Sequence, residues 1–116
     1  MTPLTETEYD ARAGSELRAL TAALDRLEAS LPAGGFEVEL EGDILRVELD
    51  GLRCVINTQR AARQLWMAAE RQAWHFDWDP AAAAWIVRRT GDELWATLRG
   101  LLERRLGYPV SLTRAA

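Results

Sequence analysis

A stretch of alternating apolar and polar residues, from Phe36 to Gln59, constrains the fold of this chain more than any other part of the sequence. The dipeptides Gly42-Asp43 and Asp50-Gly51 interrupt it, and such pairs favour two-residue turns between antiparallel strands. We therefore predict three antiparallel strands in a single register. All inward-facing pairs are then apolar: Phe36 with Leu49, Val38 with Val47, Leu40 with Leu45, Leu49 with Leu52, Val47 with Cys54, and Leu45 with Ile56. A shift of one residue would place charged side chains in the core.

The other face of this predicted sheet must be exposed, and it is where function is best sought. The residues expected there are Glu37, Glu39, Glu41, Arg46, Glu48, Arg53 and Asn57. The single cysteine, Cys54, lies among the inward residues and is expected to be a small core side chain. One cysteine cannot form a disulfide within the chain, which fits a reducing compartment.

An amphipathic helix is predicted before the strands. Apolar residues recur at steps of three and four from Tyr9 to Leu31, so the helix should begin at about Glu8 and stop at Pro32. Residues 1–7 are expected to be frayed.

Three more strands and a second helix are predicted after Gln59. The strands are expected over residues 63–69, 74–78 and 84–88. Thr90 and Glu93 have the spacing of a capping box, which predicts the start of a helix that ends at Gly107, followed by a tail that lies back on the helices. The whole chain, residues 1–116, is therefore expected to form a single α+β domain. We predict a two-layer sandwich, with two helices packed on one face of an antiparallel sheet of about six strands.

Composition excludes several classes of protein. The first 50 residues hold 12 acidic residues and 4 arginines, and the rest hold 6 and 10, so one end of the fold should attract cations and the other anions. The net charge of −4, without basic strips interleaved with aromatics, argues against a nucleic-acid partner. No apolar run is long enough to cross a membrane, and the N-terminus resembles no targeting segment. We expect a cytoplasmic protein of a bacterium.

The sequence contains no recognisable set of catalytic residues. It has one histidine, His75, which is expected to be structural or at the surface. It has no nucleophile-elbow serine, no glycine-rich phosphate loop and no ligand set for structural zinc. We therefore expect a protein that is not an enzyme.

Acidic residues form the first candidate site. Those on the first helix are Glu16, Asp25 and Glu28, and those on and after the first strand are Glu37, Glu39, Glu41 and Asp43. Residues two apart on a strand point the same way, about 6.6 Å apart, and hard cations prefer carboxylate oxygens. The predicted register, however, places Glu39 opposite Arg46 and Glu48 opposite Arg53, which neutralises part of the patch. Weak cation binding and a merely solvated surface both remain open on this pattern.

Tryptophans form the second candidate site. Trp85 and Trp95 are expected to be packed, whereas Trp66 is either on the outer face of the sheet beside Gln64 or turned inward. An exposed tryptophan near the amides of Asn57 and Gln59 would suit a partner-binding anchor.

Several short motifs in this chain resemble those of one family. They are Ile56-Asn57-Thr58-Gln59, Gln64-Leu65-Trp66, His75-Phe76-Asp77, Trp85-Ile86 and Gly91 before a leucine-rich final helix. In this order they are similar to frataxin and its bacterial form, CyaY, over nearly the whole chain. The first helix departs from the family pattern, since Thr21 and Ala22 stand where relatives often carry acids.

The resemblance implies a non-enzymatic protein that modulates iron–sulfur cluster assembly. It implies weak, reversible binding of ferrous or ferric iron by exposed carboxylates, here Asp25, Glu28, Glu37, Glu39, Glu41 and Asp43. It further implies docking on the cysteine desulfurase and scaffold complex of that machinery, with Asn57, Gln59, Gln64 and Trp66 as the partner surface. The alternative is an adaptor that uses this surface without a direct role in iron binding. We expect a monomer, with iron-dependent oligomerisation as the alternative.

Overall fold

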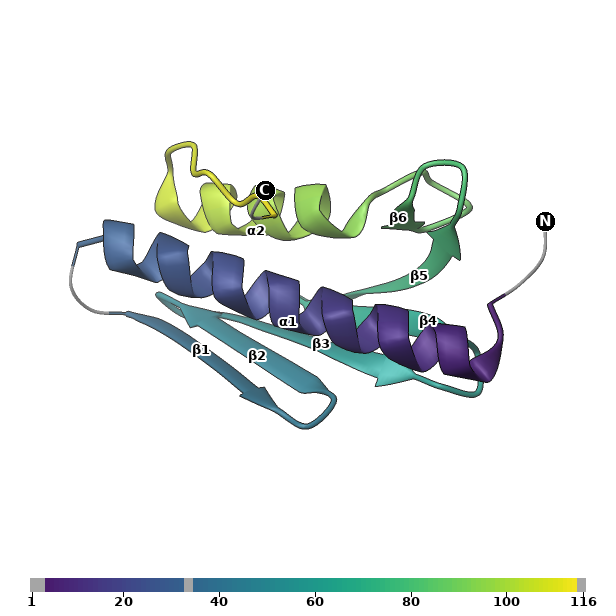
Figure 1. Ribbon diagram of the computed structural model, residues 1–116. Helices are drawn as coiled ribbons and strands as arrows, with labels where there is room; N and C mark the ends of the chain where they lie inside the picture. Colours follow the sequence, from purple (N-terminus) through teal and green to yellow (C-terminus); the bar gives the residue numbers. More distant parts are fainter. Residues whose placement is uncertain (1–3, 33–34, 115–116) are drawn as a thin grey trace.

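The chain folds into two layers, with two helices side by side on one face of a six-stranded sheet (Figure 1). The computed structural model describes residues 4–32 and 35–114. Along the chain the elements are α1 (Glu6–Ser30), β1 (Phe36–Glu41), β2 (Ile44–Leu49), β3 (Leu52–Gln59), β4 (Gln64–Ala69), β5 (Gln72–Asp79), β6 (Ala84–Ile86) and α2 (Leu94–Leu106). Each strand pairs antiparallel with the next, in the order β1-β2-β3-β4-β5-β6. The predicted fold class is confirmed.

The first three strands adopt the predicted register. The six predicted inward pairs are all observed, from Phe36 with Leu49 to Leu45 with Ile56. The two turns also behave as their residues suggest, because Gly42 has φ 59°, and Asp50 and Gly51 have φ 45° and 86°. Positive φ is accessible to glycine and tolerated by aspartate, so the turn residues and the alternation specify the same register.

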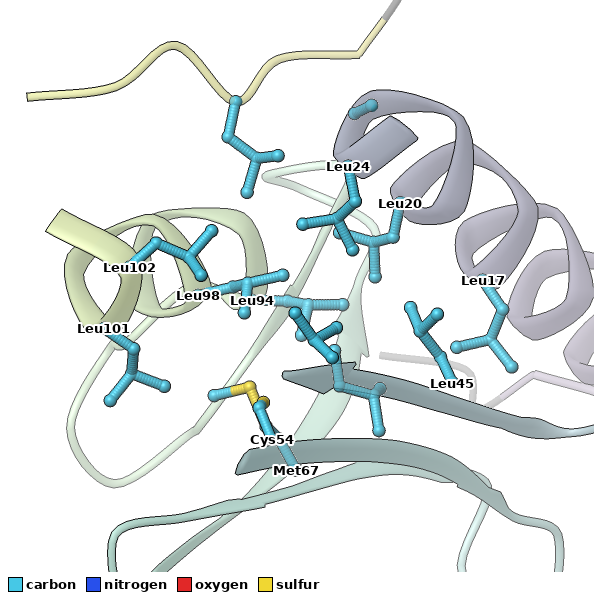
Figure 2. Packing of buried hydrophobic residues seen from close by; sticks show 14 of the residues in the cluster. Leu17, Leu20, Leu24, Leu45, Cys54, Met67, Leu94, Leu98, Leu101 and Leu102 are labelled. Atoms are coloured by element: carbon cyan, nitrogen blue, oxygen red, sulfur yellow. The ribbon is translucent and has the colours of Figure 1, made fainter. Parts of the chain in front are cut away.

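The core lies between the sheet and the helices, and leucine dominates it (Figure 2). Leu20 and Leu24 of α1 approach the leucines of α2 above Cys54 and Met67 of the sheet, and Leu17 lies beside Leu45. These side chains are at most 3% exposed, so one stripe of each helix is removed from water. Among the residues that the structure describes, no helix has both the length and the hydropathy needed to span a bilayer.

The starts of both helices differ from the prediction. Helix α1 begins at Glu6 rather than at about Glu8, because Thr5 and Glu8 form a reciprocal capping box. Of the residues expected to be frayed, 1–3 lie outside the described residues. Helix α2 has no capping box with Thr90. Glu93 is itself the N-cap, because a bridge to Ile86 keeps its backbone extended and the helix can begin only after it.

The last three strands have boundaries slightly different from the predicted ones. Strand β4 begins one residue late, since Arg63 has φ 52° in the left-handed region. Strand β5 is longer than predicted, because it pairs with β4 from Gln72 and with β6 up to Asp79. Strand β6 is shorter, because the chain turns back at Val87, whose carbonyl accepts from Thr90 and Gly91.

The C-terminal tail packs back on the helices, as predicted. Leu112 is 3% exposed, and the Arg26 guanidinium donates to the Thr113 carbonyl at 3.0 Å. Glu16, which the sequence places among the candidate acids, is buried beneath this tail. Its carboxylate accepts from Trp95 Nε1 at 2.7 Å and pairs with Arg114. Glu16 therefore belongs to the packing of the tail and not to an open acidic site.

Candidate functional site

The four residues predicted to bind a partner lie together on the outer face of the sheet. Asn57 pairs with Trp66, and Gln59 pairs with Gln64, across strands β3 and β4. All four are half-buried. Because Leu65 and Met67 fill the core, the alternation of the strand directs Trp66 outward. We call Asn57, Gln59, Gln64 and Trp66 the amide–tryptophan surface.

Hydrogen bonds and stacking hold Trp66 in place. The indole Nε1 donates to Gln64 Oε1 at 2.8 Å, and Gln64 Nε2 donates to Asp77 Oδ1 at 3.2 Å. The other oxygen of Asp77 is 3.2 Å from Arg88 Nε. The His75 ring stacks on the indole at a centroid distance of 4.1 Å and an interplanar angle of 12°. The tryptophan is therefore fixed before any partner arrives, which lowers the entropy lost on binding.

Tyr9 of α1 supports the same surface from the core side. Its hydroxyl donates to the Gln64 carbonyl at 2.7 Å and accepts from the Gln59 N–H at 3.0 Å. Burial raises the pKa of this phenol, so it stays protonated. One buried side chain thus closes the ends of β3 and β4, where both glutamines of the surface lie.

The six carboxylates predicted to bind metal are all exposed, but they do not form one site. We call Asp25, Glu28, Glu37, Glu39, Glu41 and Asp43 the acidic set. Asp25 and Glu28 lie near the end of α1, whereas Asp43 lines a surface cavity of about 390 Å³ with Tyr9 and Asp10 near its start. Helix rise alone separates Asp10 from Asp25 by about 22 Å, so the acidic set extends along one side of the molecule.

The acidic set offers suitable donors for a hard cation without a preformed site. Within the described ranges, no three Asp, Glu, His or Cys side chains come close enough to hold a metal ion together. Glu39 is paired with Arg46 at 3.3 Å, as the register predicts. The other five have no ion pair within 4 Å among residues 4–32 and 35–114. A cation here would keep most of its water ligands, which allows only weak binding.

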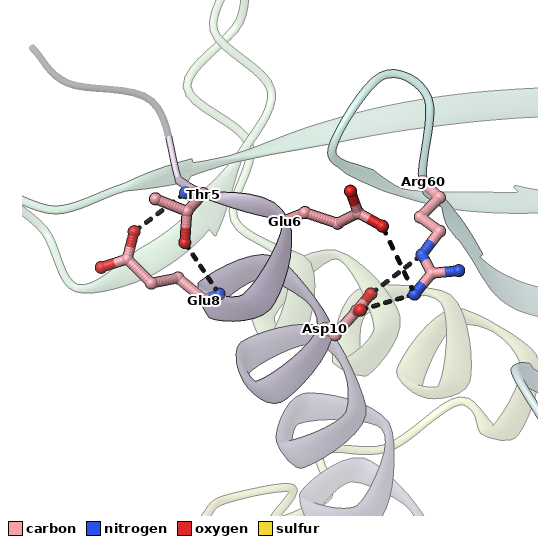
Figure 3. A network of polar contacts seen from close by, with 5 residues as sticks. All are labelled: Thr5, Glu6, Glu8, Asp10 and Arg60. Atoms are coloured by element: carbon pink, nitrogen blue, oxygen red, sulfur yellow. Dashed lines mark hydrogen bonds and ion pairs between the residues drawn. The ribbon is translucent and has the colours of Figure 1, made fainter.

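An arginine joins the strand β3–β4 loop to the start of α1 (Figure 3). Arg60 Nε is 3.1 Å from Asp10 Oδ1, and Arg60 Nη2 is 2.5 Å from Asp10 Oδ2 and 3.9 Å from Glu6. This hydrogen-bonded pairing lowers the pKa of Asp10 and raises the pKa of Arg60. Nothing local in the sequence indicates this contact, since its partners are far apart along the chain.

Two residues that adjoin the amide–tryptophan surface were not among the predicted site residues. His75 and Asp77 alternate with Trp74, Phe76 and Trp78 along β5, and this two-residue period was the signal that could have placed both on the outer face. Neither residue marks a partner surface by its type, and only the pairing of β4 with β5 brings them to Trp66 and Gln64.

The fold and the outer surface together define a class of protein: a small α+β sandwich with an exposed acidic side and a fixed tryptophan on the open sheet face. The family model for the frataxin-like domain matches residues 2–108. The chain therefore belongs to the frataxin-like family.

Relatives along the full chain agree with this assignment. The iron–sulfur cluster assembly protein CyaY of Cupriavidus metallidurans is 34% identical, over 97% of this chain and 99% of its own length. Mitochondrial frataxin of Arabidopsis thaliana is 31% identical, over 95% of this chain and 60% of its own.

Solved structures show the same fold. The frataxin of Psychromonas ingrahamii superimposes with a TM-score of 0.81 at 20% identity, covering 96% of this chain and all of that one. Trimeric frataxin of Saccharomyces cerevisiae gives a TM-score of 0.73 at 26% identity, covering 83% of this chain and 79% of that one.

Proposed function

We propose that this protein takes part in iron–sulfur cluster assembly as a non-enzymatic modulator that docks on the cysteine desulfurase and its scaffold complex. Its similarity to CyaY over nearly the full length of both chains supports the role in assembly. The single observation that carries the docking proposal is the half-buried Trp66 on the outer sheet face, oriented by Gln64 and His75.

The docking proposal has a physical rationale in two parts. A fixed aromatic side chain supplies contact area with little loss of freedom, and such residues dominate the energy of many interfaces. The acidic set supplies long-range attraction to a basic partner surface, which raises the association rate and weakens as salt screens it.

Binding of the desulfurase to the Trp66→Ala variant tests this proposal. We expect at least a tenfold loss of affinity, because hot-spot truncations cost about 2 kcal/mol or more. Tyr108→Ala is the matched control, since Tyr108 is an exposed aromatic, 45% accessible, that lies in the tail away from the sheet face. Equal affinity of the wild type and Trp66→Ala would reject docking through this surface.

Iron binding is the second part of the proposal. The acidic set would hold ferrous or ferric iron as cargo, through one or two carboxylates at a time and with water completing the coordination shell. Such exposed, weak sites would release iron readily. The absence of three converging ligands in the described part of the chain equally favours the alternative, an adaptor with no direct role in iron binding.

A thermal melt with and without ferrous iron separates the two alternatives. A cation that binds the folded state raises the melting temperature by mass action. We expect such a rise for the wild type and a smaller one for Glu37→Gln and Glu39→Gln. Glu70→Gln removes the same charge in the β4–β5 turn, outside the acidic set, and should keep the full rise. No rise in the wild type would favour the adaptor.

Location and assembly state are part of the same proposal. We propose a cytoplasmic, monomeric protein that oligomerises, if at all, only with iron. Light scattering of the protein with and without ferrous iron measures the assembly state directly.

A further inference from the structure

Acidic residues at the start of α1 are already paired with an arginine of the protein itself. We call the surface that carries Glu6, Asp10 and the acidic set the acidic side. The Arg60 guanidinium forms two contacts with the Asp10 carboxylate and lies 3.9 Å from Glu6 (Figure 3). Two carboxylates therefore pair with one guanidinium at the start of α1. Asp43 lines the same surface cavity as Asp10 and Arg60, but it has no ion pair within 4 Å among the described residues.

The position of Arg60 is fixed by its neighbours on both sides. The preceding residue, Gln59, donates its N–H to the Tyr9 hydroxyl, and Tyr9 directly precedes Asp10. On the other side, the Arg60 carbonyl accepts from the Arg63 N–H at 3.1 Å. The loop thus holds the Arg60 backbone near Asp10, so that only side-chain freedom is lost when the pair forms.

The far end of the acidic side lacks such a partner. Asp25, Glu28 and Glu37 have no ion pair within 4 Å among the described residues. A guanidinium held against carboxylates occupies their lone pairs and repels a second cation. Carboxylates at the far end are therefore free to bind a cation from solution, whereas those paired with Arg60 are not.

We propose that Arg60 is an internal competitor that closes the start of α1, at Glu6 and Asp10, to cations from solution. The proposal deepens the proposed function, because it states which carboxylates of the acidic side are accessible to iron. Arg60 thereby acts as a specificity residue, and cation binding is restricted to the rest of the acidic side.

Paramagnetic broadening of backbone amide NMR signals by Mn²⁺ tests the proposal on the whole protein. In the wild type, we expect the signals of Glu6 and Asp10 to persist. In Arg60→Gln, they should broaden at Mn²⁺ concentrations about fivefold to tenfold lower, because one repelling charge and one competing ligand are gone. Unshifted signals elsewhere will confirm that this variant folds.

Arg63→Gln is the matched control. It removes the same charge from the same loop, but Arg63 makes no ion pair within 4 Å among the described residues. We expect its Mn²⁺ response to stay within twofold of the wild type. The proposal is overturned if Arg60→Gln matches the wild type, or if the two variants respond alike, since net charge alone would then explain the change.

The same titration separates this proposal from the proposed iron role. Absence of broadening around Asp25, Glu28 and Glu37 in the wild type would count against iron binding by the acidic set. The difference between Arg60→Gln and Arg63→Gln at the start of α1 would still decide the role of Arg60.

Discussion

The two faces of the sheet use the same type of residue for different purposes. Trp85 on the inner face is 1% exposed and makes edge contacts with Tyr9 and Trp78. Trp66 on the outer face is half-buried, and its ring stacks on His75 instead. The inner tryptophan fills the core, whereas the outer one is kept accessible by polar neighbours. The environment of a tryptophan, set by strand alternation, therefore decides whether it fills the core or forms part of the surface.

The two indole N–H groups also differ in their hydrogen bonding. The outer indole has a hydrogen-bond partner in Gln64, while the buried Nε1 of Trp85 has none among the described residues. An unpaired buried donor reduces the net gain from packing. For Trp85, the apolar surface buried by the large ring outweighs the cost of the unpaired donor. For Trp66, the hydrogen bond to Gln64 orients the ring.

Truncating each tryptophan gives the largest expected contrast. Trp85→Ala should lower the free energy of unfolding by about 3–5 kcal/mol, the usual effect of removing a buried aromatic. Trp66→Ala should lower it by about 1 kcal/mol or less, because solvent already reaches its ring. Urea denaturation measures both. Similar losses for the two variants would show that Trp66 is also a core residue and would remove the distinction between the faces.

The stability of the protein at alkaline pH should show how completely the inner face of the sheet is closed to solvent. Burial raises the pKa of the Cys54 thiol to about 12, whereas an unfolded cysteine titrates near 8.5. The folded protein keeps a proton that the unfolded chain loses, so stability is full below pH 8.5 and falls as pH rises toward 12, by about 1.4 kcal/mol per pH unit.

Cys54→Ala provides the control for this pH dependence. Its stability will be lower at neutral pH, but the part of the alkaline decline that belongs to the thiol should disappear. Urea melts between pH 8 and pH 10.5 measure both slopes. Equal slopes would mean that Cys54 reaches solvent and that the inner face is less closed than its 1% exposure indicates.

The pairing of the first three strands could be predicted from the sequence, while the conformation of a later turn could not. Inward pairs such as Val47 with Cys54 follow from alternation and from turns with distinctive residues, so the register of β1 to β3 was predictable. The turn at Glu70 and Arg71 has no such signal. Both residues have positive φ without being glycine, and the strands on either side determine their conformation.

Part of the candidate site could be predicted from the sequence, and part of it depends on contacts between distant segments. Strand period alone left Trp66 either outward or inward, and it was the family resemblance that grouped it with Asn57 and Gln64. The pairing of β3 with β4 places the three residues together. The contact of Arg60 with Asp10 and the burial of Glu16 under Arg114 join segments distant in the sequence, and no local pattern encodes them. Charge type alone marked Glu16 as a candidate cation ligand, and only the tertiary fold removed it from that set.

Removing the amide that orients Trp66 should have the smallest effect and tests the outer face alone. Gln64→Ala deletes the acceptor of the indole N–H and the donor to Asp77. We expect desulfurase affinity to fall about fivefold, near 1 kcal/mol, because the ring stays in place but is less firmly oriented. The free energy of unfolding should change by less than about 1 kcal/mol, since the bonds lie partly in water. Gln72→Ala, at the exposed start of β5, is the control and should bind like the wild type. Isothermal titration measures the desulfurase affinity of both variants, and urea denaturation measures their free energy of unfolding. An unchanged affinity for Gln64→Ala would mean that stacking on His75 suffices to hold Trp66.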